Sequence, residues 1–130
     1  MSTLLKIAAL ALIVAASAYA DDWQKMKECA VQADKWEQLN TQAYGAASYR
    51  NHYSPKYNHC YVQREVEAHV KYPREGNVLS TELYDIFEEN LMAFTQVSAL
   101  LDDKGVGYID SKGSVSREEA RAYIEDHMAN

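Results

Sequence analysis

The sequence predicts an α+β fold with an N-terminal helix, a small antiparallel sheet of three to four strands, and a C-terminal helix on the same core. Apolar residues recur at helical spacing between residues 21 and 39, and they alternate with polar residues from Tyr57 onward. A helix-capping motif precedes the last segment of the chain. Two cysteines, Cys29 and Cys60, fall where they could join the first helix to the first strand.

The first twenty residues have the features of a secretory signal peptide. Lys6 supplies a positive charge, residues 7–16 form an apolar run, and an A-x-A cleavage site ends at Ala20. The apolar run is too short for a membrane-spanning helix. We therefore expect residues 1–20 to be removed, leaving residues 21–130 as one secreted or periplasmic domain without a membrane span.

The expected mature domain is acidic. Lys6 is the only charged residue in the signal peptide, so 12 of the 13 basic residues remain against 19 acidic ones, a net charge of −7. Such a charge disfavours nucleic acid and anionic membranes as partners. We expect the partner to be a protein or another component of the cell envelope.

The first element of the expected domain is a helix that begins at Asp21 or Asp22 and ends near Leu39. Its apolar stripe places Cys29 on or beside the buried face, and the stripe consists of Trp23, Met26, Cys29, Ala30, Ala33 and Trp36. Residues 44–55 are rich in glycine, serine, asparagine and proline, which predicts a loop.

The next element is a half-buried strand, because the pattern from Tyr57 onward has a period of two. Arg64 is the only break in its apolar face, which otherwise consists of Cys60, Val62, Val66, Ala68 and Val70. The residues that follow this strand indicate a turn: Pro73, Gly76 and Asn77.

Residues 80–101 allow two interpretations. Their apolar residues fit an amphipathic helix, which periodicity alone slightly favours. Glu89 and Asn90 would instead suit the turn of a hairpin between strands at 83–88 and 91–97.

The C-terminal part of the chain predicts a loop, a short edge strand over residues 106–109, and a helix over about 117–128. Ser116 and Glu119 form a capping box in front of that helix.

Residues 108–119 have the length of a calcium-binding EF-hand loop and are followed by a predicted helix. Tyr108 and Lys112 nevertheless occupy two positions at which calcium needs oxygen ligands. We therefore expect no calcium site in this segment.

The two cysteines are expected to form a disulfide bond. An isolated pair in an oxidising compartment is typically bonded, and Cys29 and Cys60 both lie on predicted core faces. The alternatives are two free thiols, or a metal site with Cys60 and histidines as ligands. Because no closely spaced pair of ligand residues recurs along the chain, we predict no metal, cofactor or catalytic residues.

Tyrosines crowd the region between residues 44 and 61, together with an arginine and two histidines. Tyrosine is common at interfaces, and equally common where a loop packs over a small core. The candidate interaction surface consists of Tyr49, Arg50, His52, Tyr53, Tyr57, His59 and Tyr61.

Residues 51–62 resemble the motif His-Tyr-x-x-Lys-x-x-x-Cys-x-Val of a group of small secreted bacterial proteins without an assigned function. The matching residues are His52, Tyr53, Lys56, Cys60 and Val62. Residues 83–88 with Ala93 resemble the group's second region, and its C-terminal helix is matched by Ser116, Glu118, Glu119, Tyr123, His127 and Met128. The resemblance implies an α+β domain with a central antiparallel sheet, and it favours the hairpin over residues 80–97.

The sequence thus favours a non-enzymatic extracytoplasmic binding protein, such as an inhibitor or an accessory factor of the envelope. The alternative is a small hydrolase or a metal-binding protein that uses His52, His59 and nearby acids. A deep pocket that contains both histidines and a carboxylate would favour this alternative, whereas a flat tyrosine-rich face would favour a binding protein.

Overall fold

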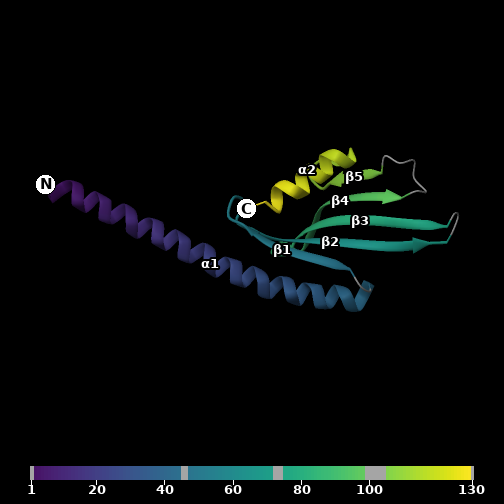
Figure 1. The fold of residues 1–130 in the computed structure, drawn as a ribbon, viewed down its shortest axis with the longest axis horizontal. Helices are drawn as coiled ribbons and strands as arrows, with labels where there is room; N and C mark the ends of the chain where they lie inside the picture. The colour runs from purple at the N-terminus through teal and green to yellow at the C-terminus, as the bar shows by residue number, and fades with distance from the viewer. Residues whose placement is uncertain (1, 45–46, 72–74, 99–104, 130) are drawn as a thin grey trace.

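The computed structural model describes residues 2–44, 47–71, 75–98 and 105–129, with the side chains of the first helix described from residue 19 to residue 41. Within these residues the chain forms two helices and six strands: α1 (Ser2–Tyr44), β1 (Ser48–Ser54), β2 (His59–Val70), β3 (Gly76–Asp85), β4 (Asn90–Ser98), β5 (Val106–Ile109), β6 (Gly113–Val115) and α2 (Arg117–His127). The strands form one antiparallel sheet in chain order (Figure 1).

The α+β class is confirmed, but the prediction of three to four strands is wrong because two short segments also join the sheet. Residues 48–54, within the predicted loop, form β1 and pair with β2 over seven residues. β6 pairs with β5, so residues 106–109 are a strand but not the edge of the sheet. Pairing with a neighbour outweighs the weak strand propensity of these segments.

The hairpin interpretation of residues 80–101 is confirmed, and the helix interpretation is wrong. The turn covers residues 86–89 and therefore begins before the predicted Glu89. It is set by Asp85, whose Oδ1 accepts hydrogen bonds from the amides of Phe87 (3.0 Å) and Glu88 (3.2 Å). Glu89 then adopts a left-handed backbone with φ of 54°.

The first helix is longer than the segment predicted from residue 21. α1 is continuous from Ser2 to Tyr44, and its N-terminal part extends well beyond the sheet (Figure 1). The sequence has no glycine or proline between these two residues, so nothing in it breaks the helix at Ala20. In the described part of the chain we find no helix with the length and apolar character needed to cross a membrane.

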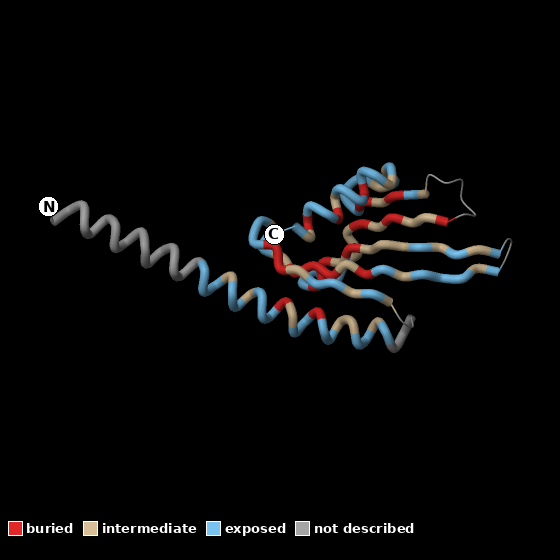
Figure 2. Tube along the Cα trace, in the orientation of Figure 1, coloured by how far each residue is buried: buried red, intermediate tan, exposed pale blue. Residues whose placement is uncertain are grey.

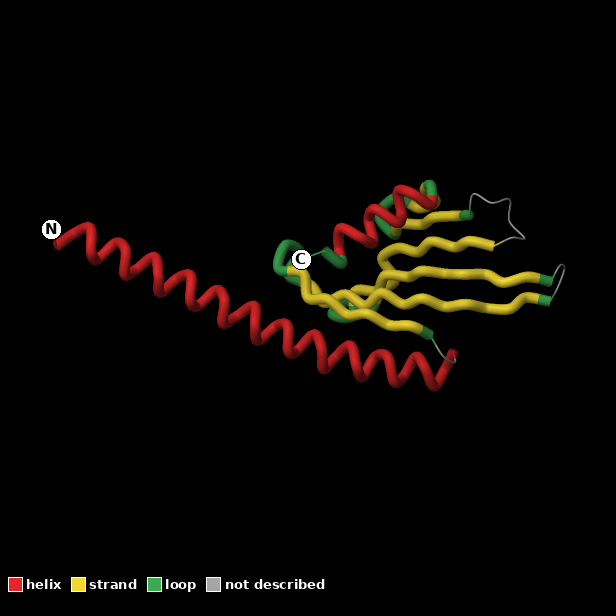
Figure 3. The backbone as a smooth tube through the Cα atoms, in the orientation of Figure 1, coloured by secondary structure: helices red, strands yellow, loops and turns green. Residues whose placement is uncertain are grey.

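The two helices cover opposite faces of the sheet, which corrects the expectation of one shared core. Successive strand residues point to opposite faces. Cys60 and Val62 pack with α1 in one cluster, while Tyr61 packs with α2 in another. Figure 3 shows α1 beside β1 and α2 over the β4–β5 side, in agreement with the helix–strand contacts.

The cluster below α1 contains the predicted disulfide, which is confirmed. Cys29 and Cys60 are bonded, with 5.3 Å between their Cα atoms, and both are fully buried. The bond therefore fixes α1 to the start of β2. Closing a loop of this length stabilises a fold by roughly 3–4 kcal/mol in the chain-entropy model.

The cluster below α2 depends on a close approach between the helix and β5. A Cβ atom at Gly107 would lie 2.4 Å from the Ser116 carbonyl oxygen and 2.9 Å from the Ala120 Cβ, so only glycine fits there. The predicted cap is confirmed, because the Ser116 hydroxyl accepts a hydrogen bond from the Glu119 amide at 3.1 Å.

Burial is concentrated where the helices meet the sheet (Figure 2). The halves of β2 and β3 farthest from the β1–β2 turn are exposed or half-buried on both faces. Of the predicted turn after β2, Pro73 lies outside the described residues, while Gly76 and Asn77 begin β3.

Candidate functional site

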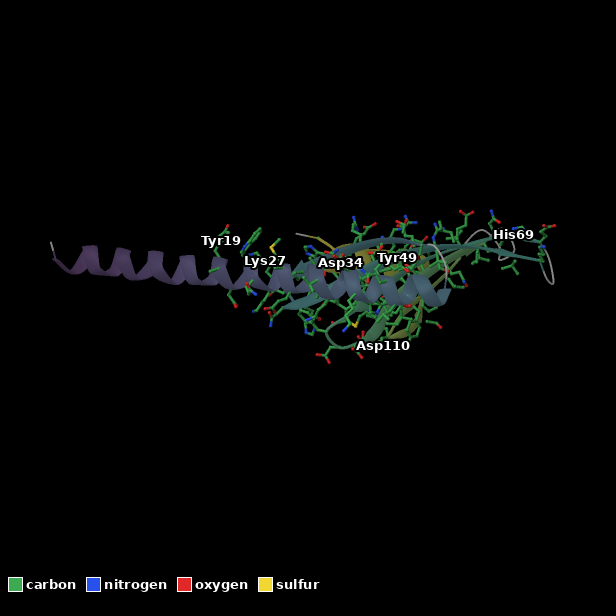
Figure 4. All side chains as sticks on the ribbon, turned by 90° about the horizontal axis from the view of Figure 1, so that it is seen from below. Tyr19, Lys27, Asp34, Tyr49, His69 and Asp110 are labelled. Carbon is green, nitrogen blue, oxygen red and sulfur yellow. A yellow bond between two sulfur atoms is a disulfide. The ribbon has the colours of Figure 1, made fainter. Side chains whose placement is uncertain are left out.

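The predicted interaction surface is divided between the two faces of the sheet. Tyr49 and Tyr53 pack against α1 in the first cluster, where Tyr53 is buried and Tyr49 is partly buried. Figure 4 shows Tyr49 close to α1. Arg50 is exposed on β1 and donates a hydrogen bond to Gln63 at 2.8 Å. The structure brings the other four residues together near the C-terminal end of α2: His52, Tyr57, His59 and Tyr61.

An aromatic cluster surrounds His127, which is the last residue of α2 and is buried. Its ring stacks on Tyr57 at 4.3 Å and on Tyr123 at 4.0 Å between centroids, and it meets Tyr61 edge-on at 5.1 Å. Its Nδ1–H donates a hydrogen bond to the Tyr123 carbonyl at 2.8 Å. We refer to Tyr57, Tyr61, Tyr123 and His127 as the aromatic cluster.

Burial shifts three ionisable side chains in and beside this cluster toward their uncharged forms: Tyr61, Tyr123 and His52. Burial raises the pKa of the Tyr61 hydroxyl, and the negative charge of Asp85 raises it further. Burial likewise raises the pKa of the Tyr123 hydroxyl. Burial lowers the pKa of His52, although its contact with the backbone of Ala129 acts in the opposite direction.

The β1–β2 turn (residues 55–58) is bound to α2 through Asp126. The Lys56 ammonium donates to both carboxylate oxygens of Asp126, at 2.9 and 3.0 Å, and the Tyr57 hydroxyl donates to the same group. Hydrogen bonding by these two residues, that of Tyr57 first, lowers the pKa of Asp126. The contacts join two segments that lie about seventy residues apart in the sequence.

His59 and Asp85 form a second ionisable pair. The Nδ1 atom of His59 lies 2.6 Å from the buried Oδ2 of Asp85, and the His59 side chain is 34% exposed. The other carboxylate oxygen, Oδ1, holds the β3–β4 turn through two backbone amides. Phe87 projects from that turn, 36% exposed, with its ring 6.4 Å from the His59 ring.

The chemistry available at the His59–Asp85 pair is that of a carboxylate-oriented imidazole. The Asp85 carboxylate lies against Nδ1, the placement by which an acid orients the imidazole of many general bases. Both cysteines are in the disulfide, so neither can act with His59 as a nucleophile.

Metal ligands do not converge in the described part of the chain, where no group of three or more His, Cys, Asp and Glu side chains could hold an ion. His69 lies at the far end of the strands (Figure 4), where it contacts Glu75 and Asn77. In the segment resembling an EF-hand loop, Glu119 is paired with the Lys112 ammonium at 2.6 Å.

Three cavities can be assigned to the described residues, and none of the three includes His52 or His59. One lies along α1, one lies over β1 and β2, and the third separates α1 from the β3–β4 turn. The two histidines therefore do not share any of these cavities with a carboxylate.

Three residues of this site are absent from the predicted interaction surface: Asp85, Phe87 and Asp126. An aspartate at the start of a turn is a recognisable signal, and Asp85 could have been found by it. Phe87 is one of the apolar residues over 80–101 that also fit an amphipathic helix, so its place in a turn is not evident from periodicity. Nothing local to Asp126 indicates that it binds Lys56 and Tyr57.

Comparisons with models of protein families, with curated proteins and with solved structures find no match to this chain.

Proposed function

We propose that the chain is a non-enzymatic extracytoplasmic binding protein that contacts a protein or another envelope component. The proposed contact surface consists of Lys56, Tyr57, His59 and Phe87, and we call it the end surface. One observation carries the proposal: the end surface combines exposed aromatic and charged groups with a rigid support. Aromatic side chains are enriched at the centres of protein interfaces.

The support comes from the contacts below the end surface. Tyr57 is stacked on His127 and hydrogen-bonded to Asp126, and His59 is held by Asp85. Phe87 follows a turn whose amides are bound to the Asp85 carboxylate. A surface ordered before binding loses less conformational entropy when a partner docks.

The partner experiment compares two exposed apolar residues of one hairpin. Phe87→Ser removes the apolar group of the end surface, and Leu79→Ser is a matched control, because Leu79 is 50% exposed on β3 but lies far along the strand. Exported protein and both variants are immobilised, and partners captured from an envelope extract are identified by mass spectrometry and then titrated. We expect Phe87→Ser to weaken binding at least tenfold, as is usual for an interface hot spot.

Equal binding by the wild type and the Phe87→Ser variant would contradict the end surface as the contact site. The same holds if only Leu79→Ser weakens binding.

A second candidate function rests on the 2.6 Å contact between His59 and Asp85. The oriented imidazole would serve as a general base in a small hydrolase. Hydrolysis of simple esters by the exported protein, lost in Asp85→Asn, would support this alternative over the binding protein.

The extracytoplasmic location belongs to the proposal and is supported by the Cys29–Cys60 bond, since disulfides persist in oxidising compartments. We also propose that the chain belongs to the group with the His-Tyr-x-x-Lys-x-x-x-Cys-x-Val motif. Intact-mass measurement of exported protein tests the location, and we expect a chain that begins at Asp21. A mass that includes residues 1–20 would contradict it.

A further inference from the structure

A groove of about 320 Å³ lies between α1 and the β3–β4 turn (residues 86–89). It opens on the α1 side of the sheet, the opposite side from α2. The residues that line it are Gln32, Lys35, Trp36, Leu39, Ile86 and Glu89. Its volume is at the lower end of the range of small-molecule sites, roughly 300–1,000 Å³.

The apolar part of the groove is partly rigid and partly open to solvent. The Trp36 ring packs on Tyr84 at 4.7 Å and meets Tyr49 edge-on at 6.0 Å, so the indole is held in place. Ile86 is buried in the cluster below α1. Leu39 is 59% exposed, so part of the apolar wall lacks a cover among the described residues.

Two opposite charges lie on facing walls of the groove. Lys35 belongs to α1 and Glu89 to the turn. Within the described ranges, no ion pair or hydrogen bond engages either side chain, whereas most other cations near the sheet are paired. The groove therefore presents one positive and one negative group with apolar surface between them.

Glu89 occupies a backbone conformation that is costly for glutamate. Its φ is 54°, in the left-handed region where glycine or asparagine is accommodated more easily. At the equivalent place of the β1–β2 turn the chain has Asn58, with φ of 55°. The Glu89 carboxylate makes no contact that would offset this backbone cost. It therefore does not stabilise the fold and is available to a ligand.

We propose that the groove binds a small zwitterion with an apolar side chain, of the size of an amino acid or a dipeptide. Its ammonium group lies against Glu89, its carboxylate against Lys35, and its side chain against Leu39. A neutral sugar fits less well, because one side of the Trp36 indole is packed on Tyr84. The site is separate from the end surface and does not depend on the function proposed above.

The two walls of the groove are joined by the disulfide. Cys29 lies on α1, and the carbonyl of its partner Cys60 accepts a hydrogen bond from the Ile86 amide at 3.0 Å. The relative position of Lys35 and Glu89 therefore depends on this bond.

The test is an NMR titration of ¹⁵N-labelled exported protein with the dipeptide Leu-Leu, its N-acetyl derivative, its C-terminal amide and free leucine. We expect saturable shifts of the Trp36 indole N–H and of the Ile86 and Glu89 amides. Each blocked derivative should bind about fivefold more weakly than Leu-Leu, as expected for loss of one partly exposed ion pair. Free leucine distinguishes an amino-acid site from a dipeptide site.

Single substitutions test which charged group of the peptide is bound by Glu89 and which by Lys35. The Glu89→Gln variant should bind Leu-Leu and its N-acetyl derivative with equal affinity. It should still bind Leu-Leu more tightly than the C-terminal amide. The Lys35→Gln variant should bind Leu-Leu and its C-terminal amide with equal affinity, and it should still bind Leu-Leu more tightly than the N-acetyl derivative. Glu88→Gln is the matched control, because Glu88 is an exposed acid of the same turn that does not line the groove, and it should keep both preferences.

Four results would overturn the proposal. The first is the absence of saturable shifts at millimolar peptide, and the second is equal affinity for free and blocked peptides. The third is a shift of the groove resonances with protein concentration alone, which would assign the groove to a second copy of the chain. Tighter binding of N-acetylglucosamine than of Leu-Leu would equally reject a zwitterion.

Discussion

The two turns at one end of the sheet share a backbone conformation but differ in the contacts that their side chains make. The β1–β2 turn and the β3–β4 turn each have four residues, and each ends in a non-glycine residue with a left-handed backbone. These residues are Asn58 in the first turn and Glu89 in the second.

Side chains of the β1–β2 turn bind residues of both helices. The Asn58 Oδ1 accepts hydrogen bonds from the Lys25 ammonium at 2.9 Å and from the Tyr53 hydroxyl at 2.8 Å. Lys56 and the neighbouring tyrosine bind Asp126 of α2. This turn thus links the two helices, although they lie on opposite faces.

The β3–β4 turn is held from beneath, by the Asp85 carboxylate and by the Ile86 amide on the Cys60 carbonyl. Its remaining side chains are exposed, and Glu89 has no polar contact within the described structure. The β1–β2 turn therefore joins the two helices through its side chains, whereas Phe87, Glu88 and Glu89 of the β3–β4 turn are exposed.

The largest expected effect comes from the disulfide, which supports both turns. We expect Cys29→Ser and Cys60→Ser each to lower the free energy of unfolding by roughly 3–4 kcal/mol. The double variant should cost little more than either single one, because the pair acts as a unit. Urea denaturation measures the change, and two free thiols in the denatured, unreduced protein would disprove the bond.

The next effect separates the two turns directly. Asn58→Ala should lower the free energy of unfolding by about 2 kcal/mol, because it removes two hydrogen bonds and leaves a left-handed alanine. Glu89→Ala should be nearly neutral, since alanine has the same backbone cost and no contact is lost. Equal losses in the two variants would contradict the assigned roles.

Glycine should then change stability in opposite directions at the two positions. Glu89→Gly relieves backbone strain and should raise the free energy of unfolding by about 0.5 kcal/mol, after the entropy cost of glycine. Asn58→Gly relieves the same strain but loses both side-chain bonds, and it should lower stability by about 1 kcal/mol. Thermal unfolding of both variants shows whether their stability changes, relative to the wild type, have opposite signs.

The smallest effect is a pH dependence of the β1–β2 turn. The pKa of Asp126 is lowered in the folded state, so its contribution is complete above its unfolded pKa of about 3.9 and is lost as the pH falls through the folded value. We expect the stability difference between wild type and Asp126→Asn to be constant from neutral pH to about pH 5 and to shrink below about pH 4. A change near neutral pH would implicate a histidine instead.

Several features were determined by the sequence alone because their signals are local. Ser116 and Glu119 identify the start of α2, since a cap needs only neighbouring residues. The alternation in β2 placed Cys60 on a buried face, and this made the bond with Cys29 predictable.

Other features were decided only by the tertiary structure, because they depend on contacts between distant segments. The residues of β1 lack an apolar pattern and become a strand by pairing with β2. Alternation along β2 separates two faces, but it does not tell which helix covers which face. The contact between Lys56 and Asp126 and the groove between α1 and the β3–β4 turn join residues far apart in sequence. Local propensity carries no information about such pairs, so only the packed chain brings them together.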